Sequence, residues 1–326
     1  MSDLTPRVKV ITVPTPFKIG PVHPYVIAGD PLTLVDAGPK TEDAWQALVT
    51  GLAEHGYRLK DIERIILTHA HTDHFGLLRR VIEEADAPLY THQRSLSWLR
   101  DAPHEWEHRA EFFYTLWAQS GVPEERLNNM RFGIALGAQY TDALLPEMTV
   151  YEIDEGARLT LGGAEWHVLY TPGHSSSHIS LYQPDSQQLM SGDHLLLRIS
   201  SNPVLEPPEC GESRRRSLVE YMSSLQRIAG MEISVAWAGH GPPVYGHHAL
   251  IAKRLENTHA RKEKIAGLMA DGPRTVYEMS ETLFPDLSTS DLFLGISEII
   301  GHLDLLELEG RLCIEDREGV WWYSAS

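Results

Sequence analysis

The stretch IILTHAHTDH at residues 65–74 joins an apolar run to four potential metal ligands within six residues. Histidine imidazoles and a carboxylate suit zinc and other borderline divalent metals. The end of a buried strand is a rigid support that can hold such ligands in a fixed geometry. With 17 histidines in the chain some will cluster by chance, but chance explains one pair more easily than His-x-His-x-Asp-His. The stretch therefore predicts a metal site whose other ligands come from elsewhere in the chain.

The composition is that of an ordinary globular protein. The chain has 326 residues, 42% hydrophobic and 22% charged, enough for one large domain and a smaller one. Cys210 and Cys313 are too few and too far apart for a disulfide framework, which favours a reducing cytoplasm. The N-terminal segment lacks a signal-peptide core, and no stretch approaches the roughly 20 apolar residues of a membrane helix. We therefore expect a cytoplasmic protein that does not enter a membrane.

The net charge bears on the partner. The chain has 28 basic and 45 acidic residues, and its formal net charge is −17. A surface that binds nucleic acid needs clustered Lys and Arg. The balance favours a small-molecule substrate, although a local basic groove for nucleic acid stays open as an alternative.

Strand and helix patterns alternate over the first 90 residues and resume near residue 149. Between them, residues 93–145 are rich in aromatic residues and predict a helical insertion. These aromatics have two interpretations, packing between helices or the wall of a lid over a substrate pocket. The predicted strands lie at 8–13, 24–28, 33–36, 65–68, 149–153, 158–163, 165–170, 179–182, 189–190 and 235–237, and the helices at 41–55, 75–85, 211–228 and 248–269.

The tail from about residue 272 reads as a separate small unit. Residues 275–278 can open one helix, and residues 288–291 can cap a longer one that ends near Gly310. Residues 311–314 and 320–323 predict a terminal hairpin. Helix, helix and β-hairpin in this order resemble a winged-helix module.

Three further segments have the same pattern as residues 65–74, in which an apolar strand is followed by a turn with a candidate ligand. These ligands are His174, Asp193 and His240, and a glycine precedes each of them. Glycine lets the backbone turn sharply and approach a metal closely. Each segment alone is weak evidence, but in this order after residues 69–74 they are strong.

The motifs THAHTDH (68–74), TPGH (171–174), SGDH (191–194) and GHG (239–241), with LVDAG at 34–38, resemble the metallo-β-lactamase superfamily. The resemblance covers roughly residues 8–248. It implies an α+β fold, a four-layer αβ/βα sandwich of two β-sheets flanked by helices, with two metals at one edge. We place the catalytic domain at residues 1–250, including the insertion, and a connecting helix and small winged-helix-like domain at 251–326.

The same resemblance implies a role for each ligand. His69, His71 and His174 would hold the first metal, Asp73, His74 and His240 the second, and Asp193 would bridge the two. Asp73 is also the expected catalytic residue, placed to orient a metal-bridging hydroxide. Zinc is the expected metal, with iron or manganese as alternatives. Asp36 reads either as an acceptor for a ligand histidine or as a turn residue.

Many members of this superfamily carry a C-terminal winged-helix-like module, among them a branch with endoribonuclease activity on single strands. A DNA-reading helix needs basic residues. The stretch 288–310 instead has five acidic residues and no Lys or Arg. We therefore interpret the module as a packing element or a homodimer contact.

The leading functional hypothesis is a dinuclear metal hydrolase acting on a small ester, thioester or lactone. The alternatives are a phosphodiesterase or endoribonuclease acting on single-stranded RNA, and an iron-dependent sulfur dioxygenase on the same scaffold. A fourth possibility is a metal-stabilised interaction protein, against which the complete ligand set argues. Fold alone does not choose among them.

Overall fold

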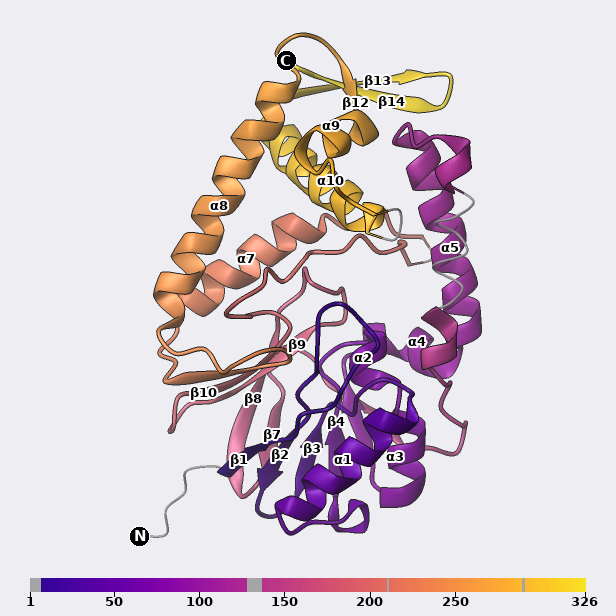
Figure 1. Ribbon diagram of the computed structural model, residues 1–326. Coiled ribbons are helices and arrows are strands. Elements are labelled where there is room, and N and C mark those ends of the chain that lie inside the picture. The colour runs from indigo at the N-terminus through magenta and orange to yellow at the C-terminus, as the bar shows by residue number, and fades with distance from the viewer. Residues whose placement is uncertain (1–6, 128–136, 210, 289–290) are drawn as a thin grey trace.

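Two mixed β-sheets form the centre of the molecule (Figure 1). The computed structural model describes residues 7–127, 137–209, 211–288 and 291–326. The first sheet has the order β1 (Arg7–Val10), β2 (Tyr25–Ala28), β3 (Thr33–Val35), β4 (Arg64–Ile66), β5 (Leu89–Thr91), β6 (Val150–Glu152). The second has the order β11 (Val235–Ala238), β10 (Gln188–Gly192), β9 (Ile179–Gln183), β8 (Ala164–Tyr170), β7 (Arg158–Leu161).

Three apolar clusters define four layers. Between the sheets, Ile27 and Ile66 of the first pack with Trp166 of the second. Helices α1 (Glu42–Glu54) and α3 (Leu78–Ala85) cover the outer face of the first sheet. Helices α7 (Ser217–Ala229) and α8 (His247–Leu268) cover the outer face of the second. The predicted helix–sheet–sheet–helix sandwich is therefore confirmed.

Local signals placed most elements, with three corrections. The predicted helix at 75–85 is two helices, α2 (Thr72–Phe75) and α3, which are separated at Gly76. A Cβ on Gly76 would lie 2.4 Å from the Tyr140 carbonyl oxygen, so the chain packs too closely there for a side chain. The predicted helix at 211–228 begins only at Ser217. The predicted strand at 158–163 ends at Leu161, because Gly162 and Gly163 turn with positive φ.

The insertion forms α4 (Leu96–Arg100) and α5 (Ala102–Gln119). Phe113 and Trp117 of α5 are buried in one cluster with the C-terminal helices, where they meet Ile296 and Met279. These two aromatics therefore pack between helices, as one of the two interpretations predicted. Residues 128–136 of the insertion, like Cys210, lie outside the described residues.

The C-terminal segment has the predicted order of helix, helix and hairpin. It comprises β12 (Arg274–Thr275), α9 (Val276–Leu283), α10 (Leu292–Leu308), β13 (Leu312–Arg317) and β14 (Val320–Ala325). The three strands form a small sheet in the order β12-β14-β13 at the upper end of Figure 1. Of the predicted caps of α10, Thr289 and Ser290 lie outside the described residues. The Asp291 carboxylate pairs with Lys18 and makes no capping bond.

The acidic side chains of residues 291–309 have a structural explanation. Each contacts a basic side chain of the β1–β2 loop, of the segment that precedes α7, or of α8. The pairs are Asp291–Lys18, Glu298–Arg261, Asp304–Arg214, Glu307–Arg216 and Glu309–Lys262. Exposed pairs contribute little each, whereas the Asp304 and Lys262 side chains are buried, and the pairs link the C-terminal segment to these parts of the chain. Among the described residues, no helix is both long and apolar enough to cross a bilayer.

Thr275→Ala should destabilise the C-terminal segment. The Thr275 hydroxyl accepts from Glu278 N (3.2 Å) and the Glu278 carboxylate accepts from Thr275 N (3.0 Å), a reciprocal cap of α9. Loss of such a cap costs about 1 kcal/mol, measurable as the free energy of unfolding in urea. Thr282→Ala, at the other end of α9, is the control. An equal loss in both variants would contradict the role of the cap.

Candidate metal centre

The direction of the strands in the second sheet brings three of the predicted ligands to the same edge of that sheet. β8 and β10 are both antiparallel to β9, and β11 is parallel to β10. Strands β8, β10 and β11 therefore run in one direction. His174 follows the carboxyl end of β8, Asp193 that of β10, and His240 that of β11. The end of β4 joins this edge through a hydrogen bond from Ile179 N to Thr68 O (2.9 Å).

The predicted residues converge into overlapping groups. Two triads each place one ligand atom per residue within 4.8 Å of the others: His69, His71 and His174, and Asp73, His74 and His240. Asp193 lies between the triads. Its Oδ1 is 3.5 Å from His74 Nε2, and its Oδ2 is 3.6 Å from His174 Nε2. All seven side chains predicted from the sequence are thus neighbours, with Asp193 in the middle.

Hydrogen bonds on the outer side of the rings determine which nitrogen faces the cluster. His174 Nδ1 donates to Asn202 O (3.1 Å), and His240 Nδ1 donates to a carbonyl of the β1–β2 loop (2.8 Å). His74 Nδ1 donates to Asp36 Oδ2 (2.8 Å). Carbonyl and carboxylate oxygens only accept, so each neutral ring keeps its lone pair on Nε2. The inward-facing atom is therefore the one able to bind a metal.

The inward-facing atoms are buried and lack partners. Among the described residues, five of them make no hydrogen bond: Nε2 of His69, His74, His174 and His240, and Oδ1 of Asp193. Buried polar atoms are nearly always satisfied. Metal ions held by the two triads and Asp193 would satisfy these atoms, and imidazole nitrogen with carboxylate oxygen is a donor set for borderline divalent metals. The residues present therefore fit a metal.

Electrostatics divide the site into two halves. Burial, followed by neighbouring histidines, holds the pKa of His69 and His71 well below the ordinary value, and burial lowers that of His174. Burial acts in the same direction on His74 and His240, but Asp193 and a second carboxylate outweigh it and raise the pKa of both. One half thus offers neutral imidazoles, the form that ligates metal, and the other concentrates negative charge.

Two glycines leave room for this arrangement. A Cβ on Gly239 would lie 2.1 Å from Asp193 Oδ1 and 2.9 Å from His74 Cε1. Gly173 has φ +128, and a Cβ there would lie 2.3 Å from the Tyr221 backbone nitrogen. Glycine before the ligand is therefore a steric requirement at both positions.

Asp36 is the acceptor for a ligand histidine, as one of its two interpretations predicted. Besides His74 Nδ1, its carboxylate accepts from Thr68 N and Thr68 Oγ1, both at 2.8 Å. With its proton directed at Asp36, Thr68 Oγ1 accepts from His69 Nδ1 (3.0 Å). One buried carboxylate therefore orients His74 directly and His69 through Thr68.

Two other residues near the site were not foreseen. The Asn202 carbonyl orients His174 from a segment without a motif. Arg109 of α5 packs over the ring of Phe113 (5.1 Å), and its charge adds to burial and His174 in lowering the pKa of His71. Nothing in the sequence singles out either residue, because each reaches the site only through tertiary packing.

His178 also supports the site, by contacts with two turns that carry candidate ligands. Its Nδ1 contacts Thr171 Oγ1 (2.9 Å), and its Nε2 accepts from Asp193 N (3.2 Å). It thus fixes the turn that carries Asp193. His194 is buried against the ring of Tyr221, and its nitrogens have no partner among the described residues.

Comparison with known proteins identifies the family. The sequence profile of the metallo-beta-lactamase superfamily matches residues 18–240, and the chain belongs to this superfamily. It is 37% identical over 310 residues to the probable metallo-hydrolase YqjP of Bacillus subtilis, covering 94% of this chain and 93% of that protein. The chain is accordingly a metal-dependent hydrolase.

The likeness extends through the C-terminal segment. The crystal structure of the metallo-beta-lactamase family protein TTHA1429 from Thermus thermophilus superposes with a TM-score of 0.79 at 27% identity, covering 98% of each chain. A more distant relative is an atrochrysone carboxyl ACP thioesterase of Aspergillus fumigatus. It is 22% identical over 297 residues, which cover 86% of this chain and 74% of that protein.

Gly239→Ala should impair the centre without changing a ligand. The added methyl group would displace Asp193 or His74, and misplacement by about 1 Å can cost roughly 100-fold in rate. Metal content of the purified protein and kcat/KM measure the effect. Gly267→Ala is the matched control, because a Cβ there meets nothing within 4 Å. Unchanged metal content and activity in Gly239→Ala would contradict the predicted steric requirement.

Asp36→Asn should lower metal affinity or activity by about 10–100-fold, the usual effect of losing a partner behind a ligand. The amide would replace an oxygen that accepts from His74 or Thr68 with a donor. Asp86→Asn is the control, because Asp86 is exposed and shares the left-handed backbone (φ 54, against 60 for Asp36). Equal metal affinity of Asp36→Asn and the native protein, by competition with a chelator, would overturn the assignment.

Proposed function

We propose that the protein is a dinuclear metal hydrolase that cleaves a small ester, thioester or lactone. The observation that carries this proposal is the convergence of two candidate metal-binding triads, one of three histidines and one of two histidines and Asp73, on either side of Asp193. The A. fumigatus relative supports acyl chemistry, since its name describes a thioesterase.

His69, His71 and His174 would hold one metal, and Asp73, His74 and His240 the other, with Asp193 shared. When bound, two divalent metals would supply a hydroxide nucleophile at neutral pH and polarise the substrate's carbonyl oxygen. Zinc suits this ligand set best.

Asp73 is the residue we assign to proton handling. Its Oδ2 lies 3.2 Å from His240 Nε2, and the residue is only partly buried, unlike His74. Burial would raise the pKa of Asp73, but the neighbouring His240 and His74 outweigh it and keep the carboxyl ionised. An ionised carboxylate at the open side can accept a hydrogen bond from the attacking water and orient it.

The charge distribution favours a small substrate over RNA. The chain carries a net charge of −17, and the stretch 288–310 of the winged-helix-like module that we propose has no Lys or Arg. Its acidic residues are engaged in docking the module. Counterion release, which drives binding to a polyanion, has few contributors there.

His71→Ala should abolish hydrolysis and lower bound metal while leaving the far-UV CD spectrum unchanged. The substitution removes one imidazole from the neutral triad and leaves the buried ligands in place. His259→Ala, an exposed histidine on α8, is the control. Full activity of His71→Ala on a substrate that the native protein cleaves would exclude the proposed centre.

The substrate class is tested with natively purified protein. Metal analysis should give two equivalents, and activity should appear on thioesters, lactones or simple esters but not on phosphodiesters or single-stranded RNA. Cleavage of RNA alone would overturn the acyl assignment. One equivalent of iron with sulfur dioxygenase activity would overturn the hydrolytic one.

A further inference from the structure

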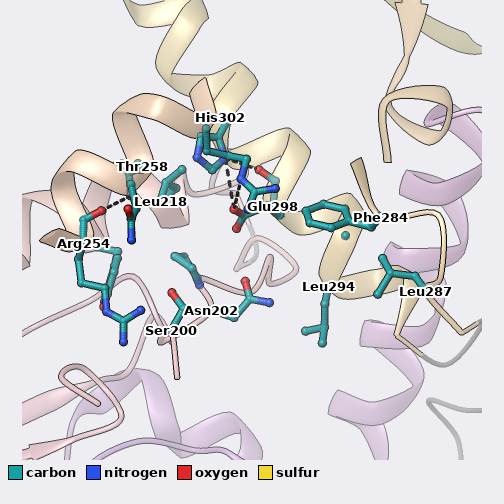
Figure 2. Close-up of a pocket in the computed structure, with 15 residues that line it drawn as sticks. Ser200, Asn202, Leu218, Arg254, Thr258, Phe284, Leu287, Leu294, Glu298 and His302 are labelled. Atoms are coloured by element: carbon teal, nitrogen blue, oxygen red, sulfur yellow. Dashed lines mark hydrogen bonds and ion pairs between the residues drawn. The ribbon is translucent and has the colours of Figure 1, made fainter. Parts of the chain in front are cut away.

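A cavity of about 420 Å³ lies between the catalytic part and the C-terminal segment. Figure 2 shows it between α8, α10 and the segment that contains Ser200 and Asn202. The volume is in the range of small-molecule sites. None of the proposed metal ligands lines it, so it is distinct from the metal centre.

The lining is divided by chemistry. Phe284, Leu287 and Leu294 form an apolar side (right in Figure 2), and Arg254 and Thr258 lie on the opposite, polar side. Such a cavity suits a molecule with one apolar and one polar end. It is too small for a nucleic-acid strand or a folded partner.

The lining as a whole carries an excess of positive charge. Two guanidinium groups, Arg254 and Arg261, stand against one carboxylate, Glu298. Arg254 donates to the backbone carbonyls of Leu196 and Ile199, which leave its charge uncompensated. Arg261 approaches Glu298 only at 3.9 Å and lies over the ring of Phe284. In a chain of net charge −17 such a lining selects for an anion, and guanidinium binds carboxylate or phosphate with directed hydrogen bonds.

One residue connects the cavity to the metal centre. Asn202 lines the cavity, and its carbonyl orients His174. Its side-chain Oδ1 is buried and makes no hydrogen bond among the described residues. A ligand in the cavity would therefore contact the segment that fixes a metal ligand.

We propose that this cavity is a second binding site, which takes a small amphipathic anion with a carboxylate or phosphate head and an apolar tail. The head group lies against Arg261 and Arg254, and the tail lies along Phe284 and Leu294. The proposal goes beyond the hydrolase activity and does not depend on it. A carboxylate is nevertheless also what hydrolysis of an acyl ester releases.

The test is calorimetric titration of the metal-loaded protein with octanoate, octyl phosphate and, as the neutral probe, 1-octanol. We expect saturable binding of one or both anions, weakening with salt, and much weaker binding of octanol. Arg261→Gln should reduce anion affinity about tenfold or more, since a charged hydrogen bond is worth roughly 1.5–3 kcal/mol. Lys264→Gln, an exposed charge on the same helix outside the cavity, should bind like the native protein.

Two further variants locate the binding. Leu294→Trp should fill the cavity and block both anions, while circular dichroism and thermal melting check the fold. His71→Ala should still bind them, because the cavity does not need the metal. Loss of anion binding in His71→Ala would place the anion at the metal centre and overturn the proposal. So would equal affinities in Arg261→Gln and Lys264→Gln, equal binding of octanol, or no saturable binding at all.

Discussion

The arrangement of the candidate centre depends on the hydrogen bonds that the buried carboxylate of Asp36 accepts. Asp36 follows β3, adopts the left-handed backbone region, and accepts hydrogen bonds from Thr68 and His74. It therefore joins the ends of β3 and β4 and orients the ligand loop that follows β4. A non-glycine residue in that region is uncommon, and Asp is among the types that tolerate it. The hydrogen bonds that the conformation makes possible are what offset its cost.

Burial and neighbouring charges then determine which ionisable groups are charged. Burial lowers the pKa of His69 and favours its neutral form, whereas His74 and His240 outweigh the desolvation of Asp193 and keep that carboxylate ionised. The outer hydrogen bonds settle the tautomers and direct Nε2 inward. The same donor set with free ring rotation would lack this convergence. Preorganisation by backbone carbonyls and Asp36 is thus as much a part of the site as the ligands themselves.

The parts of the structure that could be predicted are those encoded locally. Strands, the glycines before ligands and residues 69–74 all lie within short windows of sequence. They were sufficient to indicate the superfamily and the sandwich. Asn202 and Arg109 could not be predicted, because their roles depend on which distant segments meet. The break at Gly76 depends in the same way on the close approach of Tyr140.

The insertion and the C-terminal segment are joined by a shared apolar core. Phe113 and Trp117 of α5 share a core with α9 and α10, so segments far apart in sequence stabilise one another. Val204 and Leu205 belong to the same cluster, and they follow directly on the Asn202 segment behind His174. The C-terminal helices therefore do more than cover an edge of the catalytic part. They support, through this shared core, the backbone that orients a candidate metal ligand.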